Sequence, residues 1–189
     1  MSKRDEFVWP QGQSCAVSLT YDDGLPVHYD LVGPLLEHYG LRGTFYVPAA
    51  SDVRVHPERW RLLARRGHEL GNHSLFHPCT RLPERESWLQ PWQDLRSYTL
   101  HRLREELATA NLILQLLDDQ AERTYGNTCC ETEVGRDDAR TSMAPVLQEL
   151  FVAARGPLNG RVVDVRQPVD LHHVGHFSGD GLTFQAIKA

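Results

Sequence analysis

The sequence predicts an α/β protein built on a parallel sheet, either open or barrel-like. Short apolar runs alternate with segments of helical spacing along the chain, and repeated strand–helix units pack as parallel sheets. The 189 residues, of which 41% are hydrophobic, are enough for one core. Because no repeat, low-complexity linker or composition change divides the chain, we expect a single domain over residues 1–189.

Each element follows from a local pattern. Strands are expected where apolar, β-branched or aromatic residues run together, namely at 15–21, 43–47, 68–72, 123–125 and 151–154. Helices are expected where apolar residues recur with a period near 3.6, namely at 31–39, 57–66, 92–118 and 138–150. Gly40 and Gly67 follow two of these helices, as C-cap glycines do. The tail after Gly156 is expected to be irregular, with a further helix beginning at 183–187.

Acidic and imidazole side chains follow two of the predicted strands. Asp22 and Asp23 end the first strand, and His73 and His77 follow the third. The carboxyl ends of parallel strands share one edge, where ligand sites gather. On a helical turn, an i, i+4 spacing puts both imidazoles on one face, and a distant carboxylate would complete a three-ligand metal site. The second carboxylate can then act as a base, which predicts metal-assisted hydrolysis.

Each half of this pattern also has a simpler interpretation. A histidine pair four residues apart often lies on an exposed helix without function. An Asp-Asp-Gly sequence is commonly only a turn. The two together, each after a predicted strand, favour the metal site.

Composition excludes several other classes of function. The net charge is −5 and the basic residues are scattered, so we expect no nucleic-acid partner. No apolar stretch approaches the ~20 residues of a membrane span. The N-terminus shows no apolar export signal, which predicts a cytoplasmic protein. In that compartment the four cysteines are expected to be thiols.

Two sequence motifs resemble those of one known protein family. The stretch TYDDG at 20–24 resembles the first motif of the polysaccharide deacetylases, the NodB-like carbohydrate esterases of family 4. The stretch ELGNHSLFH at 69–77 resembles their second motif, and residues 43–47 match the strand between them. The resemblance extends over about residues 13–160. It implies a distorted, incomplete (β/α) barrel that removes acetyl groups from N- or O-acetylated sugars.

The resemblance also implies a role for each matched residue. Asp22 would be the catalytic base. Asp23, His73 and His77 would bind one divalent metal ion, with zinc expected. Ser74 would steady the histidine loop by hydrogen bonding. Arg155, at the end of the predicted strand 151–154, resembles an arginine that holds the catalytic base ionised, although an exposed arginine is the alternative.

The third family motif is altered in this chain. Asn127, Thr128 and Cys130 stand where the family has an aromatic residue, proline and glycine, while Cys129 falls at the family's cysteine. A backbone amide of this loop can still stabilise an oxyanion, because that role needs no particular side chain. No Cys-His pairing indicates a nucleophile, so Cys129 is expected to be structural.

The last family motif, an apolar strand with a histidine that acts as general acid, has no match before Ala189. The late histidines, His172, His173 and His176, fall in a glycine-rich stretch, so the domain is expected to be truncated at its C-terminus. Two alternatives follow: an amidohydrolase of a non-sugar C–N bond, and a non-catalytic metal- or glycan-binding remnant. Trp88 and Trp92 either stack on a sugar ring or anchor a loop.

Overall fold

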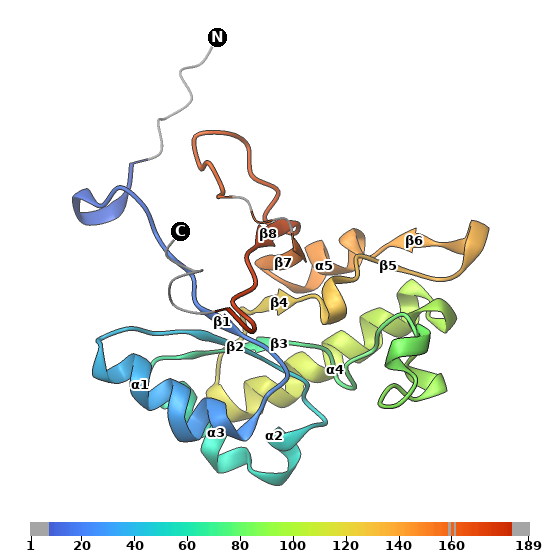
Figure 1. The fold of residues 1–189 in the computed structure, drawn as a ribbon, viewed down its shortest axis with the longest axis horizontal. Coiled ribbons are helices and arrows are strands. Elements are labelled where there is room, and N and C mark those ends of the chain that lie inside the picture. Colours follow the sequence, from blue (N-terminus) through green and yellow to red (C-terminus); the bar gives the residue numbers. More distant parts are fainter. Residues whose placement is uncertain (1–7, 159, 161, 183–189) are drawn as a thin grey trace.

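The computed structural model describes residues 8–158, 160 and 162–182. The helix expected at 183–187 lies outside them. Within this part of the chain, six strands form one sheet in the order β1-β2-β3-β4-β7-β8, and each neighbouring pair is parallel (Figure 1). The strands are β1 (Thr20–Tyr21), β2 (Thr44–Val47), β3 (Glu69–Asn72), β4 (Thr124–Gly126), β7 (Ala153–Leu158) and β8 (Val174–His176). A short antiparallel pair, β5 (Glu133–Val134) and β6 (Thr141–Ser142), forms a separate two-stranded sheet.

Helices connect most neighbouring strands of the sheet. They are α1 (Gly33–His38), α2 (Asp52–Val55), α3 (Pro57–Arg65), α4 (Leu100–Asp118) and α5 (Ala144–Leu150). A π-helical turn at His28–Val32 leads into α1. None of the helices in the described part of the chain is both long and apolar enough to cross a membrane.

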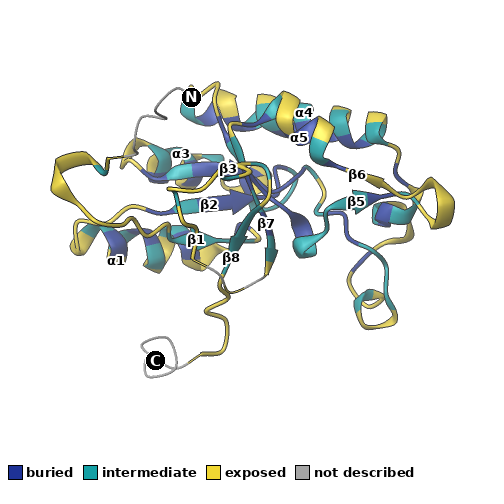
Figure 2. Cartoon of the chain, turned by 90° about the horizontal axis from the view of Figure 1, so that it is seen from above, coloured by how far each residue is buried: buried dark blue, intermediate teal, exposed yellow. Residues whose placement is uncertain are grey.

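Strand side chains alternate between two environments, as the pleat requires. Phe45 of β2 pairs with Leu70 of β3, and Tyr125 of β4 pairs with Ala154 of β7, and all four side chains are buried in the hydrophobic core. Figure 2 shows β2 and β3 largely buried, while the outer surfaces of the helices are exposed. The core therefore lies between the sheet and its helices. The opposite face of the sheet is free to carry polar groups.

That opposite face is built around one aromatic ring. A Cβ added to Gly71 or Gly126 would lie 2.4 Å or 2.6 Å from ring atoms of Tyr46, so both strands need glycine where the ring crosses them. The guanidinium of Arg155 lies 4.9 Å from the centroid of the same ring. The sheet curls around these residues into a half-barrel (Figures 1 and 2). This confirms the predicted distorted, incomplete (β/α) barrel.

Three predicted boundaries are wrong. The first strand is only Thr20–Tyr21, and Val17 before it is 80% exposed, so the apolar run packs against the core only from Leu19 onward. The helix expected from 92 begins at Leu100, where the Thr99 side chain accepts the Arg102 N–H and caps it. The helix expected from 138 begins at Ala144, because residues 141–142 pair in β6 instead.

The tail also departs from the expectation. β7 continues past Gly156 to Leu158, and β8 adds a strand beside it, with Arg155 paired to Val174. An irregular tail was expected because glycine and proline interrupt its apolar pattern. Pairing with an existing strand edge overrides that local signal.

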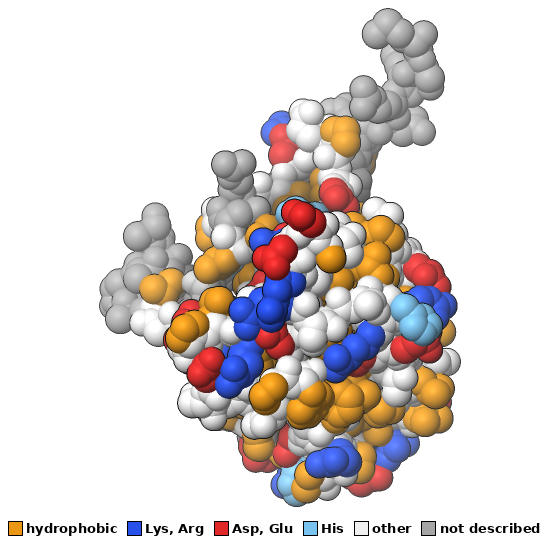
Figure 3. All heavy atoms as spheres, turned by 90° about the vertical axis from the view of Figure 1, so that its right-hand side faces the viewer, with side chains coloured by type: hydrophobic (Ala, Val, Ile, Leu, Met, Phe, Trp, Pro, Cys, Tyr) orange, Lys and Arg blue, Asp and Glu red, His pale blue; other side chains and the backbone are white. Residues whose placement is uncertain are grey.

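Charged side chains of both signs cover the side formed by the β5–β6 pair and the segment before α4. Figure 3 shows acidic and basic groups interspersed there with hydrophobic ones. The ion pairs Arg104–Glu149 and Arg140–Glu133 are partly or largely solvent-exposed, so each adds little stability.

Candidate metal centre and active site

The predicted site residues meet at the carboxyl edge of the sheet. Asp22 and Asp23 follow β1, and His73 and His77 lie in the loop after β3. A pocket of about 780 Å³ opens over this edge and is lined by all four side chains. This volume lies within the usual range for small-molecule sites.

Asp23, His73 and His77 form a compact donor set. Asp23 Oδ1 lies 3.1 Å from His77 Nε2 and 3.5 Å from His73 Nε2. Two ligands bonded at 2.0–2.1 Å to a tetrahedral zinc ion lie about 3.3 Å apart. The three residues therefore fit a divalent ion both in chemistry and in spacing.

The charge states suit that role. Hydrogen bonds from His73 and then His77 hold the pKa of Asp23 well below its usual range, so the carboxylate is ionised. On the other side of its ring, His73 Nδ1 lies 2.6 Å from the carbonyl oxygen of Gly126. A carbonyl can only accept, so Nδ1 carries a proton, and Nε2, which donates to Asp23 here, is the nitrogen that would ligate a bound ion.

The histidine loop is not the helical turn that the spacing indicated. Ser74 and His77 both have positive φ, 66° and 56°, which an α-helix does not allow. Instead, the Ser74 hydroxyl accepts the His77 N–H at 2.8 Å, as expected for Ser74. The two rings come together because the loop turns back on itself, with ring centroids 4.9 Å apart.

Two buried residues support this loop and were missed by sequence reasoning. Glu106 of α4 accepts the Phe76 N–H at 3.2 Å and the Tyr98 hydroxyl at 2.8 Å. Asn72 accepts the Ser74 N–H at 2.6 Å and donates to the carbonyl of Leu107 at 3.0 Å. Asn72 lay inside the recognised motif without an assigned role. Glu106 gave no signal, because a glutamate in a helix usually faces solvent.

Asp22 is held by an arginine of β7, a strand that β2, β3 and β4 separate from β1. The guanidinium of Arg155 donates to Asp22 Oδ2 at 2.5 Å and to the Thr20 hydroxyl at 3.0 Å. The Arg155 side chain is only 11% exposed, which excludes the surface-arginine alternative. The other oxygen, Asp22 Oδ1, has no hydrogen-bond partner among the described residues. One carboxylate oxygen is thus fixed and the other remains available as an acceptor.

The expectation of four thiols is wrong, because Cys79 and Cys129 form a disulfide. Their Cα atoms are 5.9 Å apart although 50 residues separate them in the chain, while Cys15 and Cys130 are free. The reasoning from compartment and spacing did not detect a pair so distant in sequence. The bond ties the loop of His77 to the altered third motif.

A disulfide and a hydrogen bond fix the shape of the altered third motif. Cys129 and Cys130 have φ of 51° and 59°, a conformation that favours glycine. The Thr128 hydroxyl also donates to the Pro78 carbonyl, so two links hold the turn against the histidine loop. The amides of Cys130 and Glu131 donate to Asn127 and Thr128 within the turn. These two amides are therefore already engaged. That a backbone amide binds the oxyanion stays a prediction for the other residues of the loop.

His176 is better placed than its sequence context indicated. It ends β8 rather than lying in an irregular stretch, and its buried Nδ1 has no hydrogen-bond partner among the described residues. Burial, followed by the charge of Arg155, lowers the pKa of His176, while Asp22 raises it. His176 lies on the strand that pairs with β7, which carries Arg155.

The two tryptophans have different positions. Trp88 lines the pocket, with its ring 5.9 Å from that of His77. Trp92 packs edge-on against Phe76 at 5.1 Å, which is the loop-anchoring alternative. Trp88 is therefore the tryptophan available to a ligand.

The fold and the site define a barrel-type α/β protein with a candidate metal centre at the carboxyl ends of its strands. Residues 11–126, more than half of the chain, match the polysaccharide deacetylase family. The chain belongs to the polysaccharide deacetylase family.

One curated protein is similar to the chain in sequence, and several solved structures are similar to it in fold. A gellan lyase from a Bacillus species is 26% identical over 149 residues, which are 79% of this chain but only 5% of that protein. A Streptococcus pyogenes deacetylase solved with acetate has a TM-score of 0.57 at 15% identity, over 76% of this chain and 56% of its own. A carbohydrate esterase family 4 pseudoenzyme from Bacillus anthracis has 0.52 at 14% identity, over 72% and 41%. The chain thus spans about half of each solved relative.

Proposed function

We propose that this protein is a metal-dependent hydrolase that removes acetyl groups from N- or O-acetylated sugars. The observation that carries the proposal is the donor set of Asp23, His73 and His77 beside the Asp22–Arg155 pair. Membership of the polysaccharide deacetylase family supports the reaction class. Zinc fits the donor set of one carboxylate and two imidazoles.

In the proposed hydrolysis, the metal ion and the protein's own residues have separate roles. When bound, a divalent ion supplies Lewis-acid polarisation of the acyl oxygen and increases the acidity of water. Asp22 accepts the proton of the attacking water through Oδ1, while Arg155 holds Oδ2 and orients the carboxylate. We assign no residue to proton donation toward the leaving group, because His176, the late histidine that ends β8, is not among the residues that line the pocket.

The pocket suits a sugar better than an apolar ligand. Asp22, Gln93 and Asp180 offer polar groups around it, and the half-exposed indole of Trp88 offers a flat apolar face. A sugar ring presents the same combination of hydroxyls and an apolar face. We therefore assign Trp88 to contact with the substrate.

Metal analysis tests the centre first. Purified protein loaded with zinc should hold about one ion per chain. Asp23→Ala and His77→Ala should each lose it, whereas Asp30→Ala, which removes an exposed aspartate, should keep it. Metal retained by both site variants would contradict the assignment.

Acetate release then separates the enzyme from its alternatives. The metal-loaded protein should release acetate from acetylated chito-oligosaccharides, and Asp22→Asn should abolish release without losing the metal. An inactive protein with metal bound, unaltered by Asp22→Asn, would indicate a binding protein. Cleavage of non-sugar amides alone would indicate an amidohydrolase.

A further inference from the structure

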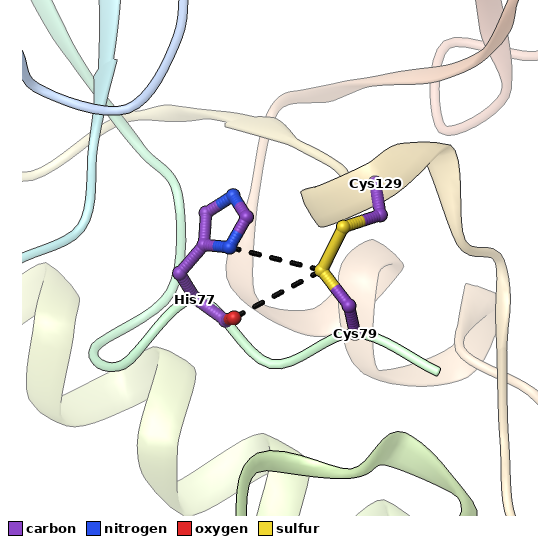
Figure 4. A group of neighbouring side chains, drawn as sticks. All are labelled: His77, Cys79 and Cys129. Atoms are coloured by element: carbon purple, nitrogen blue, oxygen red, sulfur yellow. Dashed lines mark hydrogen bonds between the residues drawn. A yellow bond between two sulfur atoms is a disulfide. The ribbon is translucent and has the colours of Figure 1, made fainter. Parts of the chain in front are cut away.

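The imidazole of His77 faces different groups through its two nitrogens. Nε2 points to Asp23 at 3.1 Å, while Nδ1 lies 3.7 Å from the sulfur of Cys79. Figure 4 shows the ring beside the Cys79–Cys129 disulfide, with Nδ1 directed at the sulfur. A metal-ligating histidine usually directs its second nitrogen to a carbonyl or carboxylate, as His73 does with Gly126. The partner of His77 is instead a group that changes chemistry on reduction.

Reduction would leave three good metal ligands at this place. Nδ1 of His77 and the sulfurs of Cys79 and Cys129 all lie within 4.8 Å of one another. In a tetrahedral zinc site, a nitrogen and a sulfur lie about 3.6 Å apart and two sulfurs about 3.8 Å apart. The observed 3.7 Å between Nδ1 and Cys79 already fits, and the sulfurs need only separate once their bond is broken.

We propose that the reduced protein has a second metal site, formed by His77 Nδ1 and the thiolates of Cys79 and Cys129, which binds zinc or another thiophilic cation. A dithiol reductant gives two electrons and two protons to the disulfide and is itself oxidised to a disulfide. The cation then displaces the two thiol protons. Softer thiolate ligands favour zinc over magnesium or calcium.

The disulfide can be reached from the pocket. Cys129 is half-buried and lines the pocket, whereas Cys79 is fully buried. An attacking thiolate therefore meets the Cys129 sulfur first, and Cys79 leaves as the thiolate. In a reducing compartment this site would be available.

The two metal sites compete for His77. A neutral imidazole has one lone pair, on the nitrogen without a proton, so it can ligate through Nε2 or through Nδ1 but not both. Occupation of the thiolate site would draw His77 away from Asp23 and His73. This consequence for catalysis rests on the proposed function, whereas the thiolate site itself does not.

Cobalt is a suitable probe, because thiolate ligation produces a charge-transfer absorption that nitrogen and oxygen ligands do not. The protein is reduced with a phosphine, which is then removed without air, and thiol titration should rise from two per chain to four. The thiolate band should appear on adding Co²⁺ only after reduction. His73→Ala should keep the band, because His73 belongs only to the first site. This separates failure of the thiolate site from failure of the proposed function.

Cysteine variants identify the ligands. Cys79→Ser and Cys129→Ser should each lose the band, while the double variant Cys15→Ser/Cys130→Ser should retain it. Where a serine variant does not fold, reduced wild-type protein alkylated at its thiols replaces it and should also lack the band. A reduced wild type with four thiols and no band, or a band that persists in Cys79→Ser, would overturn the proposal.

Discussion

Arg155 and Asp22 are joined across the sheet by a hydrogen bond of 2.5 Å, although 133 residues separate them in the chain. Their strands are not neighbours, since β2, β3 and β4 lie between β1 and β7. The contact is possible only because the sheet curls. The half-barrel thus brings a cation of β7 to the carboxylate that we assign as the base.

Arg155→Met should reduce acetate release while leaving the metal in place. A charge-assisted hydrogen bond is lost at a partly buried carboxylate, which costs about 1.5–3 kcal/mol, or roughly 10- to 150-fold in kcat. Steady-state kinetics together with metal analysis measure both effects. Arg104→Met removes an exposed ion pair and serves as the control. Unchanged kcat in Arg155→Met would refute the role of this pair.

Gly126→Ala should destabilise the protein. The added methyl would lie 2.6 Å from the Tyr46 ring, and overpacking costs roughly 1–3 kcal/mol. That exceeds the ~0.4–1 kcal/mol usually gained from a stiffer unfolded chain. Urea unfolding measures the difference. Gly179→Ala is a matched control, because nothing lies within 4 Å of its added methyl, so its stability should stay equal or rise slightly.

The parts of the site that sequence reasoning could predict are those encoded by adjacent residues. Asp22 and Asp23 end one strand and His73 and His77 follow another, so strand ends alone bring them together. The Cys79–Cys129 bond and the Glu106 contacts depend instead on how distant segments pack. The apolar periodicity also placed the start of the long helix too early, at residue 92. The helix begins at Leu100 because Thr99 caps it there, and periodicity alone does not locate a cap.

Glu106→Ala should weaken metal binding without touching a proposed ligand. The Phe76 N–H and the Tyr98 hydroxyl would lose their acceptor, and the loop between His73 and His77 would be less well held. Loss of such outer support typically costs 10- to 100-fold in metal affinity. Zinc affinity is measured by competition with a chromophoric chelator. Glu105→Ala, at the exposed neighbouring position, should bind zinc as the wild type does. Equal affinity in the two variants would contradict the supporting role.

Stability should fall as the pH is lowered below about 6.5, in part through His68. Its Nδ1 accepts the Gly43 N–H at 3.1 Å, and burial lowers its pKa although Glu37 opposes the shift. The unfolded chain therefore binds a proton that the folded one resists, so stability is present above the unfolded pKa and is lost below it. One such group contributes at most about 1.4 kcal/mol per pH unit.

Urea unfolding between about pH 7.5 and 5.5 should show a smaller pH slope of the unfolding free energy for His68→Gln than for wild type. His28 shifts in the same direction, so some slope remains, and exposed His101→Gln should keep the full slope. A wild-type slope in His68→Gln would show that this histidine does not contribute.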